Sequence, residues 1–144
     1  MADGSYEVIA LVPPGRGFEI GEVVRHFRSV PHGALLRSES LRSDSEIGRE
    51  GFRVWYGEWS VEAWLDRSPS VVVDNEDLAV DAPLAISDSV RGSAERLFVC
   101  SAKDPHYEHT GDFMHFTDLL QQHYGLLIYD HVVGEWYTQP TTGS

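Results

Sequence analysis

The sequence FRVWYGEWSVEAWLD at residues 52–66 predicts a tight β-hairpin. Gly57 and Glu58 form its two-residue turn, with glycine in the first position, as a type II′ turn requires. The facing pairs of this register are Tyr56 and Trp59, Trp55 and Ser60, Val54 and Val61, Arg53 and Glu62, and Phe52 and Ala63. Because side chains alternate between the two faces of a strand, one face of the hairpin is apolar. That face carries Phe52, Val54, Tyr56, Trp59, Val61 and Ala63.

The second face of the hairpin carries Trp55, Trp64 and an expected ion pair between Arg53 and Glu62. If a helix covers this face, both tryptophans belong to the core. If the face is exposed, two tryptophans among acidic residues form a candidate interface, because aromatic residues are frequent at binding hot spots. The sequence leaves both interpretations open.

Length and composition indicate a single domain over residues 1–144, with an ordered core of about 6–138 and a disordered tail at 139–144. No apolar run approaches the ~20 residues that a membrane span needs, and the N-terminus lacks the features of a signal peptide. We therefore expect a cytoplasmic protein with no membrane association. The single cysteine, Cys100, lies in the apolar run LFVCSA and is expected to be a small buried residue.

The chain is strongly acidic, with a formal net charge of −12 that is concentrated in residues 39–88, where twelve acidic residues face four arginines. A field of this sign repels phosphate backbones, so direct nucleic-acid binding is not expected. It suits a basic protein partner, or it serves solubility alone. The candidate partner-binding residues are Trp55, Glu58, Glu62, Trp64, Asp74, Glu76, Asp77 and Asp81.

Hydrophobic periodicity predicts the remaining elements. Strands are expected at 6–12, 34–37, 70–73 and 97–102, helices at 18–30, 86–96 and 112–124, and a final hairpin at 126–130 and 135–138. Residues 38–51 are interpreted as a loop or frayed helix, and 74–83 and 103–111 as exposed polar loops. Interleaved helices and tight hairpins predict an α+β fold, with two or three helices packed on a mostly antiparallel sheet.

The segment DPHYEHTGDFMHF at residues 104–116 is the strongest chemical candidate. Its His106, His109 and His115, together with Asp104 or Asp112, are residue types that bind metal ions, and a catalytic zinc needs three such ligands. A metal-dependent enzyme or metal-binding protein is therefore the alternative function. Against it, the HExxH pattern is absent and the loop composition of the segment is also explained by exposed histidines.

Other catalytic motifs are absent from the sequence. There is no GxSxG nucleophile elbow, and the glycine-rich stretch PPGRGFE lacks the Gly-Lys-Ser/Thr of a phosphate-binding loop. We expect no enzymatic activity and no cofactor.

Two passages resemble the immunity proteins that bacteria encode beside secreted polymorphic toxins. They are Asp104-Pro105 leading into the helix at His115-Phe116, and the closing YDHVVGEWY at residues 129–137, in a small acidic α+β chain. The resemblance covers about the last forty residues and transfers no individual binding residue. It implies neutralisation of a cognate toxin by occlusion.

The leading hypothesis is therefore a non-enzymatic inhibitor that binds a basic toxin domain, with a nuclease as the favoured class, through the acidic region as a monomer. A scaffold or homodimer that uses exposed tryptophans is a third possibility.

Overall fold

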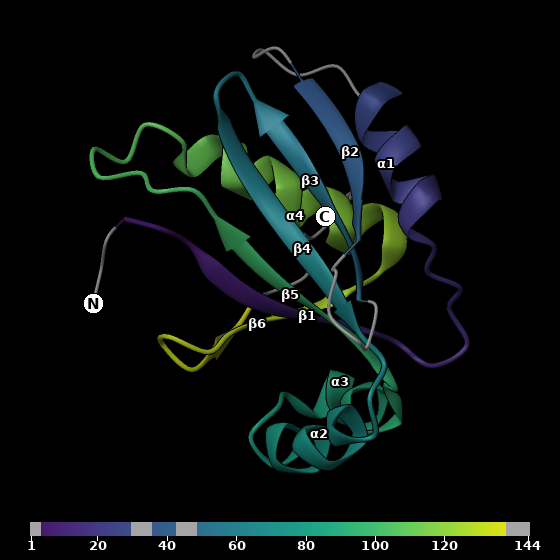
Figure 1. The fold of residues 1–144 in the computed structure, drawn as a ribbon. Helices are drawn as coiled ribbons and strands as arrows, with labels where there is room; N and C mark the ends of the chain where they lie inside the picture. Colours follow the sequence, from purple (N-terminus) through teal and green to yellow (C-terminus); the bar gives the residue numbers. More distant parts are fainter. Residues whose placement is uncertain (1–3, 30–35, 43–48, 138–144) are drawn as a thin grey trace.

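The computed structural model describes residues 4–29, 36–42 and 49–137 (Figure 1). Eleven elements follow one another in these ranges. They are β1 (Glu7–Val12), α1 (Ile20–Ser29), β2 (Leu36–Arg42), β3 (Glu50–Tyr56), β4 (Trp59–Asp66), α2 (Ser70–Val80), α3 (Leu84–Gly92), β5 (Glu95–Ser101), α4 (Thr110–Tyr124), β6 (Leu127–Asp130) and β7 (Glu135–Trp136).

The strands form one sheet in the order β2-β3-β4-β5-β1-β6-β7, and every neighbouring pair is antiparallel. Helices α1 and α4 pack on one face, where their apolar residues join the main core. Helices α2 and α3 lie at one end of the molecule and pack on the other face through a smaller cluster around Leu11 and Leu127 (Figure 1). The predicted α+β fold with a mostly antiparallel sheet is confirmed.

The β3–β4 hairpin has the predicted register, with Tyr56 opposite Trp59 and Val54 opposite Val61. Gly57 has a φ of +68°, which suits glycine at the first turn position. All six residues of the predicted apolar face are at most 5% exposed. The expected strands and helices at β1, α1, β5, α4, β6 and β7 are also present, with ends shifted by a few residues.

The main core is aromatic where the two helices meet the sheet. Phe116 of α4 stacks on Phe27 of α1 with ring centroids 5.2 Å apart, and on Phe52 of β3 at 5.8 Å. Helix α4 ends at Gly125, whose φ of +68° closes the helix in the left-handed conformation. These contacts hold α1 and α4 side by side across the strands.

The predictions of a strand at 70–73 and of an acidic loop at 74–83 are wrong, because most of these residues form α2. The buried side of α2 consists of Val71, Asn75 and Ala79, which recur every four residues. A polar residue at the centre of this stripe hides the helical pattern in the sequence. The side-chain amide of Asn75 donates to the Ser93 carbonyl at 2.9 Å, which compensates for its burial in part. The helix predicted at 86–96 begins and ends earlier, as α3.

The loop or frayed helix predicted at 38–51 is also corrected, since β2 covers Leu36–Arg42 and β3 begins at Glu50. The inward-facing Ser38 is buried and its hydroxyl donates to the Val24 carbonyl at 2.6 Å. Arg28 donates twice to the Ser38 carbonyl, at 3.1 and 2.8 Å. Helix α1 therefore supplies hydrogen-bond partners to β2, the strand at this edge of the sheet. Val30, residues 34 and 35 of the predicted strand, and the tail at 139–144 lie outside the described residues.

Candidate partner-binding surfaces

Among the described residues, α2 and α3 pack on part of the sheet face opposite α1 and α4, and α4 crosses behind this face in Figure 1. We call this face the open sheet face. Strand register aligns its side chains in rows across the sheet. One row runs through all seven strands and is rich in aromatic residues. It consists of Leu41, Gly51, Trp64, Phe98, Ile9, Tyr129 and Trp136, in that order from β2 to β7.

Trp64 lies flat against the backbone of β3. A Cβ atom placed on its cross-strand neighbour Gly51 would meet the indole ring at 2.7 Å and the Ala63 carbonyl oxygen at 2.5 Å. Glycine at this position therefore lets the ring pack on the sheet, and Trp64 is half-buried. The neighbouring Phe98 is 36% exposed. Trp64 is neither a core residue nor a freely exposed one.

A charged row lies beside the aromatic one and consists of Glu39, Arg53, Glu62, Cys100 and Glu7. Arg53 forms ion pairs with Glu62 and, at 3.3 Å, with Glu39, so the predicted Arg53–Glu62 pair is confirmed. Half-buried Trp55 lies next to this row, with the Arg37 and Arg53 guanidinium groups 4.9 and 5.4 Å from its ring centroid. Trp55 therefore already has cationic partners within the chain.

The prediction that Cys100 is buried is wrong, because its side chain is exposed on this face. In β5 the inward residues are Leu97, Val99 and Ser101, whereas Phe98 and Cys100 point outward. Because the outward-facing Phe98 is apolar, the run LFVCSA resembles a strand that is buried on both faces.

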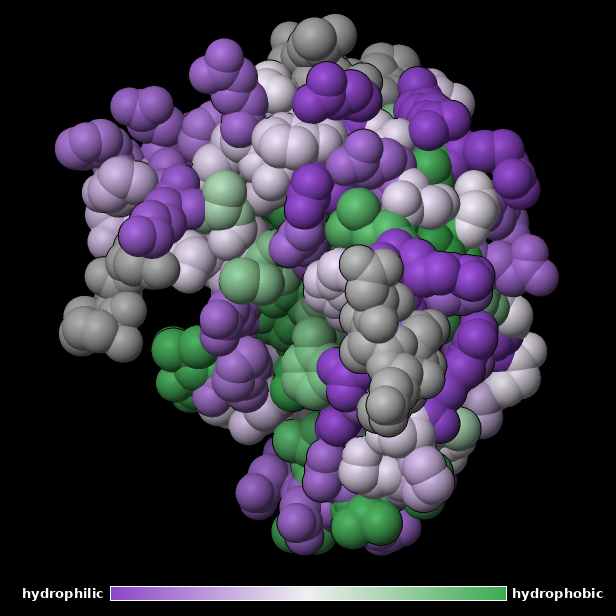
Figure 2. Space-filling model, viewed as in Figure 1, coloured by the Kyte–Doolittle hydropathy of each residue, from purple (hydrophilic) through white to green (hydrophobic). Residues whose placement is uncertain are grey.

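The second candidate surface belongs to α2 and α3, and we call it the helical surface. Residues 70–92 contain five acidic residues and one arginine. Three of its apolar side chains are strongly exposed: Val73 at 68%, Val80 at 71% and Leu84 at 94%. Figure 2 shows hydrophobic patches among hydrophilic atoms at this end of the molecule. The helical surface comprises Val73, Glu76, Asp77, Val80, Asp81, Leu84 and Asp88.

Asp74 connects the helical surface to the sheet. Arg96 is buried, donates to Asp74 at 2.9 Å and to Asp66 at 3.3 Å, and lies over the Phe98 ring at 4.8 Å. Burial opposes ionisation of Asp66, but hydrogen bonds from Ser68 and the charge of Arg96 outweigh it and lower its pKa. Asp74 therefore serves a structural ion pair, although half of its side chain is exposed.

The structure divides the predicted partner-binding residues into groups. Trp55, Glu62 and Trp64 share the open sheet face. Glu76, Asp77 and Asp81 lie exposed on α2 or directly after it, with Glu76 also 3.5 Å from Arg91. Exposed Glu58 sits at the tip of the β3–β4 hairpin, at the opposite end of the molecule from α2 (Figure 1).

Two of the three histidines of the 104–115 segment, His109 and His115, have partners within the protein. His109 stacks on Trp59, with ring centroids 4.6 Å apart, and its Nδ1 atom lies 2.9 Å from Asp112. The Nδ1 atom of His115 lies 2.8 Å from the Tyr56 hydroxyl, while His106 is exposed. In the described ranges, no three His, Cys, Asp or Glu side chains are grouped closely enough to hold a metal ion.

Asp104 organises this loop and the start of α4. It is 2% exposed and accepts hydrogen bonds from the Tyr6 hydroxyl at 2.7 Å and from the backbone N–H groups of Glu108 and His109 at 2.9 Å each. Burial opposes its ionisation, but these hydrogen bonds outweigh that effect and lower its pKa. Asp104 therefore stabilises the loop through hydrogen bonds, whereas the sequence had suggested it as a metal ligand.

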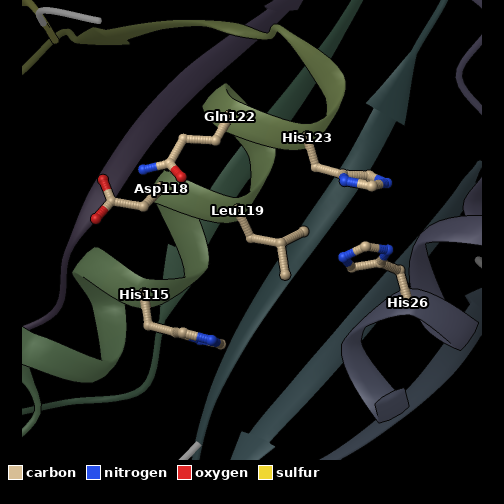
Figure 3. A pocket seen from close by; sticks show the side chains of 6 residues that line it. All are labelled: His26, His115, Asp118, Leu119, Gln122 and His123. Carbon is tan, nitrogen blue, oxygen red and sulfur yellow. The ribbon is translucent and has the colours of Figure 1, made fainter. Parts of the chain in front are cut away.

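A cleft between α1 and α4, with a volume of about 450 Å³, is lined by His26, His115, Asp118, Leu119, Gln122 and His123 (Figure 3). The rings of His26 and His123 are in contact, with centroids 3.8 Å apart. In Figure 3, Leu119 lies between this pair and His115, so the three imidazoles do not converge. Sequence reasoning missed the pair, because residues 26 and 123 carry no common motif.

Comparison with known proteins identified no matching family model, no similar curated protein and no similar solved structure. Among the described residues, every helix is too short or too polar to cross a lipid bilayer.

Proposed function

We propose that the protein is a non-enzymatic inhibitor of the immunity type, which binds a cognate basic toxin domain as a monomer and occludes its active site. A nuclease is the toxin class that this proposal favours, since an enzyme that binds a phosphate backbone presents a basic cleft. An acidic protein that fills such a cleft competes with the nucleic acid for the same charges.

The observation that carries the proposal is the coincidence of acidic and exposed apolar residues on the helical surface. Val73, Val80 and Leu84 are each more than two-thirds exposed. Acidic residues outnumber basic residues by five to one within residues 70–92. Clustered apolar residues with a polar rim are typical of protein-binding sites. Acidic residues serving solubility alone would not need exposed apolar neighbours.

The open sheet face supplies a second contact area in this proposal. Its aromatic row offers the large, half-buried rings that dominate binding energy at interfaces. Trp64 and Phe98 are direct neighbours in this row, and Arg96, which lies over the Phe98 ring, donates to Asp74 of α2. A partner that covers α2 can therefore extend onto the aromatic row.

The test is protection in cells. The proposal expects a toxin domain encoded beside the gene for this protein. That domain is expressed from an inducible promoter, with and without the protein, and growth is measured. We expect full protection by the wild-type protein and a stable one-to-one complex on purification.

The matched comparison uses two charge reversals, Asp77→Lys on the helical surface and Glu58→Lys at the hairpin tip. Each removes one exposed carboxylate, so the change in net charge is the same. We expect Asp77→Lys to reduce protection more than Glu58→Lys. Absence of a complex, or toxicity unchanged by the wild-type protein, would refute the proposed function.

A further inference from the structure

We propose that the helical surface docks a basic amphipathic helix of the partner along α2. This inference rests on the proposed function for the identity of the partner, but it makes its own prediction about the chemistry that the surface recognises.

The outer side of α2 carries exposed valines at a spacing that a docked helix can match. We call the strip formed by Val73 and Val80 the apolar seam. Val73 and Val80 are seven residues apart, so they lie about 10 Å apart along the same side of the helix. Glu76 and Asp77 lie between them, three and four residues after Val73, and flank the same side. The buried residues Val71, Asn75 and Ala79 occupy the opposite side. Helix α2 therefore has one buried side and, on the side that faces outward, two exposed valines flanked by carboxylates.

Leu84 is the third strongly exposed apolar residue of the helical surface and follows Val80 by four residues in the chain. It is 94% exposed at the first position of α3, and exposed Asp81 and Asp88 lie near it in the sequence. Arg91 lies 3.5 Å from Glu76 and bridges α3 to α2. The two helices thus present three exposed apolar side chains among carboxylates, with one cation close to them.

Charge and backbone geometry select the occupant. A second copy of this chain would bring the same acidic surface, and an anionic lipid or nucleic acid would also be repelled. A partner strand would need free backbone groups, but the groups inside α2 are used by its own hydrogen bonds. A helix with apolar residues at the spacing of Val73 and Val80, flanked by lysine or arginine, fits this surface. Its apolar residues pack on the two valines, and its cations pair with the carboxylates.

The test uses two synthetic peptides of about 16 residues, long enough to form a helix on binding. One has leucines at i, i+3, i+7 and i+10 with lysine and arginine elsewhere, and the other has the same composition in scrambled order. Binding to the full chain is followed by NMR through backbone amide chemical shifts. We expect the amphipathic peptide to shift amides of α2 and α3, and the scrambled peptide to bind at least about tenfold more weakly.

The chain provides a matched control for the apolar contact. In the test variant Val73→Ser and Val80→Ser are combined. In the control variant Val132→Ser and Val133→Ser are combined, at two valines that are 70% and 63% exposed in the β6–β7 turn. Valine and serine have similar helix propensities, so the test variant should fold like the wild type. We expect it to weaken amphipathic-peptide binding about tenfold, and the control to change it less than about twofold.

Three results would overturn the inference. They are equal binding of the two peptides, equal effects of the two double variants, and amide shifts centred outside α2 and α3. Binding to phosphatidylglycerol vesicles that is lost in the Val73→Ser, Val80→Ser variant would assign the seam to a membrane instead. If the peptide binds as expected but toxin protection fails, the proposed function is wrong while the docking seam stands.

Discussion

Val54 has no exposed surface and faces Val61 across the β3–β4 hairpin, with Phe52 and Tyr56 beside it on the same face. The substitution Val54→Asp would bury a carboxylate among apolar side chains. We expect the free energy of unfolding to fall by about 3–5 kcal/mol, which is a large part of the stability of a domain of this size. Urea denaturation followed by circular dichroism measures the change.

Val72→Asp is the matched control, because Val72 is 45% exposed in the first turn of α2, where a carboxylate is tolerated. We expect a change within about 0.5 kcal/mol. Equal stability of the two variants would contradict the assignment of the buried hairpin face.

Asp104 is expected to be the most sensitive acidic residue of the loop that precedes α4. Its substitution by alanine removes the acceptor of three hydrogen bonds, from Tyr6, Glu108 and His109. We expect Asp104→Ala to lower the free energy of unfolding by about 2–4 kcal/mol, since buried donors lose a charged acceptor. Asp88→Ala, at an exposed position of α3, serves as the control in the same thermal or urea unfolding assay. A loss below about 0.5 kcal/mol at Asp104 would show that the loop is held by other contacts.

At the scale of elements, the contact between α1 and α4 predicts a dependence of stability on pH. Burial lowers the pKa of His26 below its ordinary value of 6.5, the neighbouring His123 lowers it further, and Glu22 opposes the shift. The unfolded chain therefore takes up a proton at this site at higher pH than the folded chain. The stability that neutral His26 contributes is present above about pH 6.5 and is lost as the pH falls toward the folded-state pKa.

The substitution His26→Gln should remove this contribution. We expect the difference in the free energy of unfolding between about pH 7.5 and about pH 5.5 to be smaller in His26→Gln than in the wild type. His106→Gln, at an exposed loop position, should retain the wild-type difference. The same pH dependence in all three proteins would show that the His26–His123 contact does not couple protonation to folding.

The elements also show why the sequence predicts some parts of the fold and not others. In the β3–β4 hairpin, alternation of apolar residues and the Gly57 turn indicate the same register, and that register is found. In α2, three consecutive valines favour a strand by intrinsic preference, but burial of Val71 and packing of Ala79 with Leu11 of the sheet override it. In β2, the inward-facing Ser38 bonds to α1 instead of packing as an apolar residue, so the strand lacks alternation.

The candidate site was predictable only as a charge distribution. Glu76, Asp77 and Asp81 were expected to be exposed, and they are. The apolar partners of these carboxylates were missed, because Val73 and Val80 belong to runs of apolar residues that normally indicate burial. Only the position of α2 on the sheet shows which of its valines face outward.

At the scale of the whole molecule, the acidic residues lie at different ends and on different faces. Figure 1 places the hairpin tip with Glu58 far from α2, so one compact partner contact does not have to involve both. On the open sheet face, several carboxylates are neutralised by arginines of the chain, as in the pairs of Arg53 and Arg96. The helical surface carries four acidic residues, Glu76, Asp77, Asp81 and Asp88, against the single Arg91 beside Glu76, and is the less compensated region.

The central claim is that this surface captures a basic partner. The measurement is the stopped-flow association rate constant with the cognate toxin domain that the proposal expects, from about 50 to about 500 mM salt. Electrostatic capture predicts a fall of at least about tenfold over this range, and a slower rate at low salt for Asp77→Lys than for Glu58→Lys. A rate constant independent of salt, or equal effects of the two charge reversals, would contradict capture through the helical surface.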